Sequence, residues 1–318
     1  MDVLAVIPAR CGSKGVPNKN IINIDGKPMI EYSIEVALAS RLITRTIVST
    51  DSEHYMKIAR ECGAEAPFLR PAEFARDESL DIDVFIHMLS WLRDNENYIP
   101  DICVHLRPCA PIRNPVIVDD VIKCLIDKPK LDSIRTIARS SATPYKMWHL
   151  SDDMIITPVI THIHECYNMP RQSLPQTYYI TGYVDAVRSN IISEQRSMTG
   201  NSIGGYVLDE YFNIDYPEDI NFVEFCIKVR NKKQSFLIDV EGTLLDEERN
   251  QIQHNLEILN RLTNYGHSVY LKYKSGNEKE ILSKLGNPAV DGIVNKYIET
   301  DYYISNKAVN VSMITGAL

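Results

Sequence analysis

The chain has 318 residues, of which 44% are hydrophobic and 24% are charged, a composition typical of a globular protein with a sizeable buried core. Its formal net charge is −8, which argues against a protein that coats nucleic acid or an anionic membrane surface. Any positive charge that binds phosphate groups must therefore be gathered locally.

The seven cysteines are scattered without a C-x-x-C pair, and their odd number fits poorly with a disulfide framework. Reduced thiols are the simplest interpretation, so we expect a cytoplasmic protein. No apolar run approaches the roughly eighteen residues that a membrane-spanning helix needs. We expect neither an export signal nor a membrane span.

Strand-like and helix-like patterns alternate through the first part of the chain. Short apolar runs predict strands over residues 3–7, 46–49 and 102–106. Apolar residues with a 3.6-residue period predict helices over residues 28–39, 53–62, 82–92 and 116–126. This alternation predicts an α/β fold with a doubly wound, mainly parallel sheet of the Rossmann-like type.

The pattern becomes less regular after residue 132. Strands are predicted over 133–137, 182–187 and 205–208, an alternating, hairpin-forming stretch over 154–163, and a closing helix over 217–229. A polar, basic run at 230–234 precedes a new apolar strand at 236–238. We therefore predict two domains, a larger one over residues 1–230 and a smaller α/β domain over residues 235–318.

The loop IPARCGSKGVPNKN, residues 7–20, lies between the first predicted strand and the first helix, where α/β sheets bind ligands. It contains one Arg, two Lys, two Gly and two Pro. Glycines let backbone N–H groups approach an anion, and basic side chains neutralise phosphate groups. The loop is neither a Walker loop nor a dinucleotide fingerprint. The alternative is an ordinary basic surface loop.

The same loop resembles, along its whole length, the signature of the acylneuraminate cytidylyltransferases, the CMP-sialic acid synthetases and their relatives that act on other nine-carbon sugar acids. In that family the loop wraps the triphosphate of CTP. The resemblance implies catalytic roles for Arg10, Lys14 and Lys19, and for Asp215 in a later stretch. It implies nucleotide contacts from Ala9, Arg10, Gly12, Ser13, Lys14, Gly15 and Asn20.

Two later stretches resemble further parts of the family's nucleotide site. Residues 70–77 resemble a stretch that helps to enclose nucleotide and sugar, which implies nucleotide contacts from Arg70 and Asp77; a charged helix-capping loop is the alternative. Residues 106–113 correspond to the family's Leu-Gln/Arg-Pro-Thr-x-Pro-Leu-Arg. We assign Arg107 to the nucleotide or the sugar and Arg113 to loop structure.

Residues 144–148 and 168–182 match the segment that in this family binds the sugar acid and builds the dimer. The sugar-binding residues that the resemblance implies are Lys146, Arg171, Gln172, Tyr179 and Thr181. The first two would hold the carboxylate, and Gln172 and Tyr179 the hydroxyls. The family usually has Asn where this chain has Thr181, so that contact is shortened or lost. The resemblance also implies a homodimer or tetramer.

Residues 212–219 correspond to the family's Asp-Ile-Asp, two carboxylates that bind Mg²⁺ against the CTP phosphates. Here Asp215 is retained and the first position is Asn213, so the resemblance implies a metal site of Asp215 and Asn213, with Mn²⁺ as an alternative ion. An amide oxygen is a metal ligand without charge, so we expect weaker metal binding, which Asn213→Asp should strengthen. His162 and His164 would share one face of a strand, but no further ligands follow at zinc spacing, and a solvated strand face is the alternative.

The last part of the chain resembles another family. FLIDVEGTLL, residues 236–245, is similar to the first motif of the haloacid-dehalogenase-like phosphatases, in which the first Asp is the phosphoryl nucleophile. Asp239 matches this Asp, and Lys296 matches the family's Lys. Glu241, Lys272, Ser305 and Asn306 replace the other functional groups. We therefore predict a truncated module without phosphatase activity.

These resemblances imply an enzyme, a nucleotidyltransferase that couples CTP to a nonulosonic acid and releases pyrophosphate. The partners are then CTP and a nine-carbon sugar acid, with no nucleic acid and no membrane. Two alternatives stay open. One is a transferase for another sugar acid such as Kdo, whose loop usually lacks the Gly-Ser-Lys-Gly run. The other is a non-catalytic paralogue that binds nucleotide or a partner.

Overall fold

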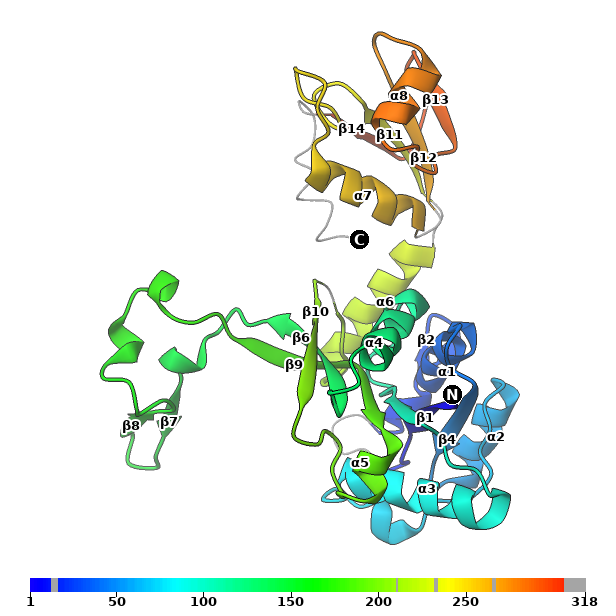
Figure 1. Ribbon diagram of the computed structural model, residues 1–318, viewed down its shortest axis with the longest axis vertical. Coiled ribbons are helices and arrows are strands. Elements are labelled where there is room, and N and C mark those ends of the chain that lie inside the picture. Colours follow the sequence, from blue (N-terminus) through cyan, green and yellow to red (C-terminus); the bar gives the residue numbers. More distant parts are fainter. Residues whose placement is uncertain (13–16, 210, 232–233, 265–266, 306–318) are drawn as a thin grey trace. The chain divides into compact units, whose positions relative to one another are not determined.

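A computed structural model describes residues 1–12, 17–209, 211–231, 234–264 and 267–305 (Figure 1). The chain forms two compact units, Met1–Val223 and Glu224–Leu318. The division falls inside α6 (Pro217–Asn231), the helix that we expected to close the first domain. In the described part of the chain, no helix is both long and apolar enough to cross a membrane.

A six-stranded sheet forms the centre of the first unit, in the order β10-β6-β9-β5-β1-β4. Its strands are β1 (Val3–Pro8), β4 (Arg45–Ser49), β5 (Ile102–His105), β6 (Ser133–Arg139), β9 (Tyr178–Arg188) and β10 (Ile203–Leu208). Only β9 runs antiparallel to its neighbours. The predicted doubly wound, mainly parallel fold is confirmed.

Helices cover both faces of this sheet, which explains why β1 is apolar at nearly every position. The helices are α1 (Met29–Ala39), α2 (Glu53–Glu61), α3 (Asp81–Glu96), α4 (Pro115–Asp127) and α5 (Ser189–Ser193). Ala5 and Ile7 belong to a core cluster with residues of α1, α2 and α4. Leu4 and Val6 point the other way, into a cluster with residues of α3 and α5.

The strand order reverses at β1. This strand pairs with β4 on one side and with β5 on the other, and both pairings are parallel. The carboxyl ends of β1 and β5 therefore flank a topological switch point, the place where open α/β sheets bind ligands. The predicted signature loop begins at this point.

Strand β9 contains an irregularity that matters for the site. Arg135 lies opposite Asp185 and Ile137 lies opposite Ile180, so β9 has extra residues between these two pairs. Gly182 lies in this bulge with φ of +67°, a conformation that side chains rarely adopt. The bulge of residues 181–184 turns the strand toward the loop that follows β5, and an added Cβ at Gly182 would lie 3.6 Å from Cδ of Arg107.

Residues 140–177, here called the arm, connect β6 to β9. They contain a hairpin of β7 (Trp148–Leu150) and β8 (Ile156–Pro158) and short turns of 3₁₀ helix. The hairpin that we predicted over 154–163 was therefore placed too late, because its first strand precedes that stretch. His162 and His164 lie in a bend and a turn, not on a strand as expected.

The second unit contains a four-stranded sheet in the order β13-β12-β11-β14, and all its pairings are parallel. The strands are β11 (Ser235–Asp239), β12 (Ser268–Lys272), β13 (Gly292–Val294) and β14 (Tyr302–Ile304), with helices α7 (Gln253–Asn264) and α8 (Glu278–Lys284). It has its own core, around Phe236, Leu259 and Leu271. Strand order reverses at β11, whose last residue is Asp239.

Candidate active site

A cavity of about 240 Å³ lies at the carboxyl ends of β1 and β5. Five of the predicted site residues line it: Arg10, Lys19, Asn20, Arg70 and Arg107. They come from three separate stretches of the sequence, and the fold brings them together at the switch point. A larger cavity of about 610 Å³ is lined by Met1 and Ile102, at the opposite ends of the strands, and contains none of the predicted residues.

The described part of the signature loop is held by polar contacts at its start. Nη1 of Arg10 lies 2.7 Å from Oδ1 of Asp77 and donates to the carbonyl of Gly12. The Asn20 amide donates to the Arg10 carbonyl over 2.9 Å, and Asp51 accepts the Cys11 N–H. Asn20 is buried, so its role here is to hold the loop. The backbone N–H of Ala9 bonds to Ser49 at the end of the sheet. Ser13, Lys14 and Gly15 lie outside the described residues.

Lys19 connects the loop to the predicted metal segment. Its Nζ lies 3.8 Å from Oδ1 of Asp215, and Asp215 is exposed. The neighbouring Ile214 donates its N–H to the Cys109 carbonyl over 2.7 Å. Two predicted catalytic residues that are far apart in sequence, Lys19 and Asp215, are thus side by side.

Arg70 is buried beneath the cavity, with 5% of its surface exposed. Its Nη2 donates to the Ser49 carbonyl over 2.7 Å, and its Nε has no hydrogen-bond partner among the described residues. Burial lowers the pKa of its guanidinium. Arg70 also lines the cavity, so its guanidinium adds positive charge there.

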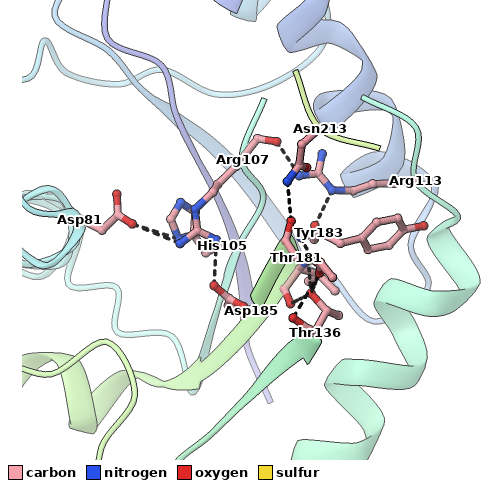
Figure 2. Close-up of polar contacts among 10 residues, drawn as sticks. Asp81, His105, Arg107, Arg113, Thr136, Thr181, Tyr183, Asp185 and Asn213 are labelled. Carbon is pink, nitrogen blue, oxygen red and sulfur yellow. Dashed lines mark hydrogen bonds and ion pairs between the residues drawn. The ribbon is translucent and has the colours of Figure 1, made fainter. Parts of the chain in front are cut away.

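Arg107 is held by two carboxylates (Figure 2). Nη1 lies 2.8 Å from Oδ2 of the buried Asp185, and Nη2 lies 3.2 Å from Oδ2 of Asp81. Burial alone would lower the pKa of Arg107, but the carboxylates of Asp185 and Asp81 raise it. Nδ1 of His105 lies 3.9 Å from the same Asp81 oxygen, and burial keeps the pKa of His105 well below its usual value. His105 is therefore neutral.

Sequence reasoning did not identify Asp81, His105 or Asp185 as site residues. Asp185 carried a signal, because it is the one charged residue within the apolar run of β9. Its partner depends on how β9 pairs with β5, where His105 lies opposite Asp185.

Arg113 is buried and holds the loop that follows β5, as we expected (Figure 2). It donates to the carbonyls of Tyr183 and Arg107 and to the Ser33 hydroxyl. Burial lowers the pKa of its guanidinium to about 10. With three acceptors satisfied inside the protein, Arg113 is structural.

None of the predicted sugar-binding residues is among those that line the 240 Å³ cavity. Lys146, Arg171 and Gln172 are exposed on the arm, and the Arg171 guanidinium donates to the Ser141 carbonyl within the arm itself. The Tyr179 hydroxyl bonds to that of Tyr211. Thr181, where we expected the family's sugar contact to be shortened or lost, is 1% exposed, and its hydroxyl bonds to Thr136.

The predicted metal segment carries two side-chain oxygen groups of different kinds. The Asn213 amide donates to the Thr181 carbonyl over 2.7 Å, and its Oδ1 is buried without a hydrogen-bond partner among the described residues. Asp215 adds an exposed carboxylate. Among the described residues, no group of three or more His, Cys, Asp or Glu has an arrangement that could hold a metal ion. This donor set fits Mg²⁺, which commonly takes one or two protein oxygens together with substrate phosphates.

In the second unit, the predicted phosphatase residues bind one another. Lys272 Nζ lies 3.3 Å from Oδ1 of Asp239, and the Tyr303 hydroxyl donates to the other oxygen of Asp239 over 2.6 Å. Glu241 accepts the backbone N–H groups of residues 274 and 275. Lys296 is exposed, and Asn306 lies outside the described residues. The Asp239 carboxylate is therefore already neutralised by a side chain.

Comparison with known proteins places this geometry in a family. A family model described as cytidylyltransferase matches residues 4–87. The N-acylneuraminate cytidylyltransferase of Escherichia coli O18:K1:H7 is 28% identical over 306 residues, which cover 95% of this chain and 68% of that protein. The CMP-N,N'-diacetyllegionaminic acid synthase of Legionella pneumophila is 34% identical over 238 residues, which cover 73% of this chain and 99% of that protein. The chain belongs to the cytidylyltransferase family.

A solved structure supports the same fold. CMP:2-keto-3-deoxy-manno-octonic acid synthetase in complex with CTP aligns with a TM-score of 0.55 and 18% identity, covering 72% of this chain and 99% of that one. At this identity the likeness shows the shared cytidylyltransferase fold. The family and the fold of this chain therefore both agree with the resemblance of the signature loop, which begins at the cavity between β1 and β5.

Proposed function

We propose that this chain transfers CMP from CTP to a nine-carbon sugar acid of the sialic type and releases pyrophosphate. One observation carries the proposal. Arg10, Lys19, Arg70 and Arg107, drawn from three stretches that resemble the family's nucleotide site, meet at one cavity of the sheet. The names of the two relatives, one for a sialic and one for a legionaminic acid, support the substrate class.

The chemistry is a displacement at phosphorus. The anomeric hydroxyl of the sugar acid attacks the α-phosphorus of CTP, the new O–P bond forms, and the bond to pyrophosphate breaks. Such a transfer depends on positioning and on stabilising negative charge, so no nucleophilic side chain is needed. The thiol of Cys11 donates to Asp51, and this hydrogen bond together with burial raises the pKa of Cys11. It is therefore unsuited to covalent catalysis.

Several basic residues can stabilise the negative charge of the phosphate groups. Arg10 and Lys19 each contact one carboxylate, Asp77 and Asp215 respectively, which leaves their remaining donors for phosphate oxygens. Arg70 adds a further positive charge to the lining of the cavity. Positive charge placed in advance at the leaving pyrophosphate lowers the barrier because the protein does not reorganise during the step.

We further propose that the enzyme uses Mg²⁺, with Mn²⁺ as an alternative, and that Asp215 and Asn213 hold it. When bound, such an ion neutralises charge on the phosphate groups. Lys19 then exchanges its 3.8 Å contact with Asp215 for the substrate. Asp215 has enough exposed surface to meet a metal–nucleotide complex entering from solvent.

We also propose that the active form is a homodimer or tetramer, built by the arm. Large apolar side chains are exposed along the arm, among them Leu150, Met154, Ile155 and Ile156. A contiguous apolar surface of this kind marks an interaction site. Lys146, Arg171 and Gln172 lie on the same arm, so pairing of two copies is the step that would bring them to a sugar site. Leu150→Asp with Met154→Asp should give a monomer by analytical ultracentrifugation.

The direct test of function is pyrophosphate release from CTP with a panel of sialic, legionaminic and pseudaminic acids and Kdo. We expect release with one or more nine-carbon acids, none with UTP or ATP in place of CTP, and loss of release when EDTA removes the metal. Release with Kdo alone would assign the chain to another sugar acid. Tight CTP binding without turnover of any acid would assign it to the non-catalytic alternative.

A further inference from the structure

Strand β9, in its bulge and just after it, contacts two segments that build the proposed site (Figure 2). Asp185 pairs with Arg107, and the Tyr183 carbonyl accepts from Arg113, so two residues of the bulged strand hold the loop that follows β5. The Thr181 carbonyl accepts from Asn213, which belongs to the metal segment. One irregularity in the sheet therefore organises groups that are distant in sequence.

The contact between Asn213 and Thr181 has a chemical direction. The backbone oxygen of Thr181 is only an acceptor, so the group that faces it has to be a donor. This requirement also determines which end of the Asn213 amide faces the strand: the NH₂ group points to Thr181, 2.7 Å away, and Oδ1 points elsewhere. An aspartate at this position has two acceptor oxygens and no donor when ionised, so it would face the carbonyl unfavourably.

The side chain of Thr181 is not hydrogen-bonded to any described residue of the metal segment. Its side chain is buried, and its hydroxyl bonds to the hydroxyl and carbonyl of Thr136 in the neighbouring strand. Among the described residues, the hydrogen bond that joins Thr181 to the metal segment is the one from the Asn213 amide. That amide, together with the bond from the N–H of Ile214 to the Cys109 carbonyl, fixes the backbone that leads to Asp215.

We propose that Asn213 is a positioning residue. The hydrogen bond from its amide to Thr181, here called the latch, holds the metal segment against the β9 bulge and so places Asp215 beside Lys19. The same bond turns the buried Asn213 Oδ1 away from the strand, where it serves as a neutral ligand. The proposal rests on the proposed function for its metal. It assigns the amide a role that aspartate cannot fill in this chain. We therefore expect Asn213→Asp to weaken metal binding. Charge alone predicts the opposite, because an added carboxylate should strengthen metal binding.

The test compares three variants of the full chain at one position. Asn213→Asp keeps the size and adds charge but lacks the donor. Asn213→Leu keeps the approximate size and lacks both donor and ligand. Asn213→Gln keeps the donor and the oxygen on a longer side chain. Bound Mn²⁺ is counted by electron paramagnetic resonance with and without CTP, melting temperatures are recorded, and kcat and KM for pyrophosphate release are measured where turnover is present.

If the latch exists, the wild type binds Mn²⁺ most tightly, Asn213→Gln binds it less tightly, and Asn213→Asp and Asn213→Leu bind it most weakly. The Mn²⁺ affinity of Asn213→Asp falls by about tenfold, the usual effect of removing a group that orients a metal ligand. The loss appears in kcat more than in KM for CTP. An affinity in Asn213→Asp equal to or above that of the wild type would overturn the proposal, whatever happens in Asn213→Leu. If Asn213→Asp does not fold, a wild-type Mn²⁺ affinity in Asn213→Leu has the same consequence.

These outcomes are separable from a failure of the proposed function. A wild-type chain that releases no pyrophosphate with any acid refutes the function, while the order of Mn²⁺ affinities and melting temperatures still decides for or against the latch. Asn190→Asp, an exposed position on α5, is the matched control for an added charge. It should leave Mn²⁺ binding unchanged.

Discussion

The guanidinium of Arg107 lies 2.8 Å from a carboxylate, Asp185, that is itself only 4% exposed. This pair joins the loop after β5 to the bulged strand at the edge of the proposed site. Because a cation left without its buried partner is costly, we expect Asp185→Asn to lower the free energy of unfolding by about 2 kcal/mol, with Asp81 still neutralising part of the charge. Urea denaturation measures this. The exposed pair of Arg93 and Asp94 supplies the control, since Asp94→Asn should change little.

Reversal of charge in the signature loop should remove nucleotide binding without unfolding the protein. Lys14 lies outside the described residues, so this prediction comes from the sequence. An exposed loop lysine contributes little to stability, and we expect Lys14→Glu to lose CTP binding by calorimetry while its melting temperature stays near that of the wild type. Lys57→Glu, an exposed change on α2, should bind CTP normally. Wild-type affinity in Lys14→Glu would remove the loop from the site.

Loss of the Asp215 carboxylate should weaken metal-dependent turnover. Asp215→Ala removes the only charged ligand of the proposed metal site and frees Lys19, so we expect pyrophosphate release to fall by about tenfold or more at limiting Mg²⁺. Excess Mg²⁺ should restore part of it, because the nucleotide carries ligands of its own. If Asp215→Ala has the Mg²⁺ dependence of the wild type, the ion binds elsewhere.

His105 should make the protein less stable in acid. Burial lowers its pKa in the folded state, so the unfolded chain takes up a proton that the folded chain does not as the pH falls below about 6.5. Stability is therefore retained above that pH and decreases on acidification. His105→Gln should flatten the fall in melting temperature between about pH 7 and 5. Burial also lowers the pKa of His87 and His267. Both residues are present in the wild type and in His105→Gln, so the difference in pH dependence between these two proteins reports on His105. The exposed His149→Gln should keep the wild-type slope.

The second unit should lack phosphatase activity. Lys272 and Tyr303 bind both oxygens of Asp239, and Glu241 stands where the phosphatases that this stretch resembles have their acid/base Asp. We expect the full chain to hydrolyse neither p-nitrophenyl phosphate nor a sugar-acid phosphate, and Asp239→Asn to leave cytidylyl transfer unchanged. Mg²⁺-dependent phosphate release that disappears in Asp239→Asn would contradict this and make the protein bifunctional.

Local pattern was sufficient to predict most of the elements. The sequence predicted strands β1, β4 and β5 and helices α1, α3 and α4 where the structure has them. A strand covered on both faces must be apolar along its length, and a helix covered on one face must have apolar residues at the helical period. The hairpin of the arm was misplaced. Its side chains are exposed in the single chain, so burial imposed no clear period on them.

The sequence by itself determined the family, through a loop that resembles the family's signature along its whole length. It also determined the order of strands and helices, which depends on burial between near neighbours. Only the tertiary structure decided that β9 is antiparallel and bulged and that Asp185 is the partner of Arg107. It also decided that the Thr181 side chain is buried and that the Asn213 amide donates to Thr181. These contacts join residues that are far apart along the chain, and their geometry follows from strand register, which no local pattern encodes.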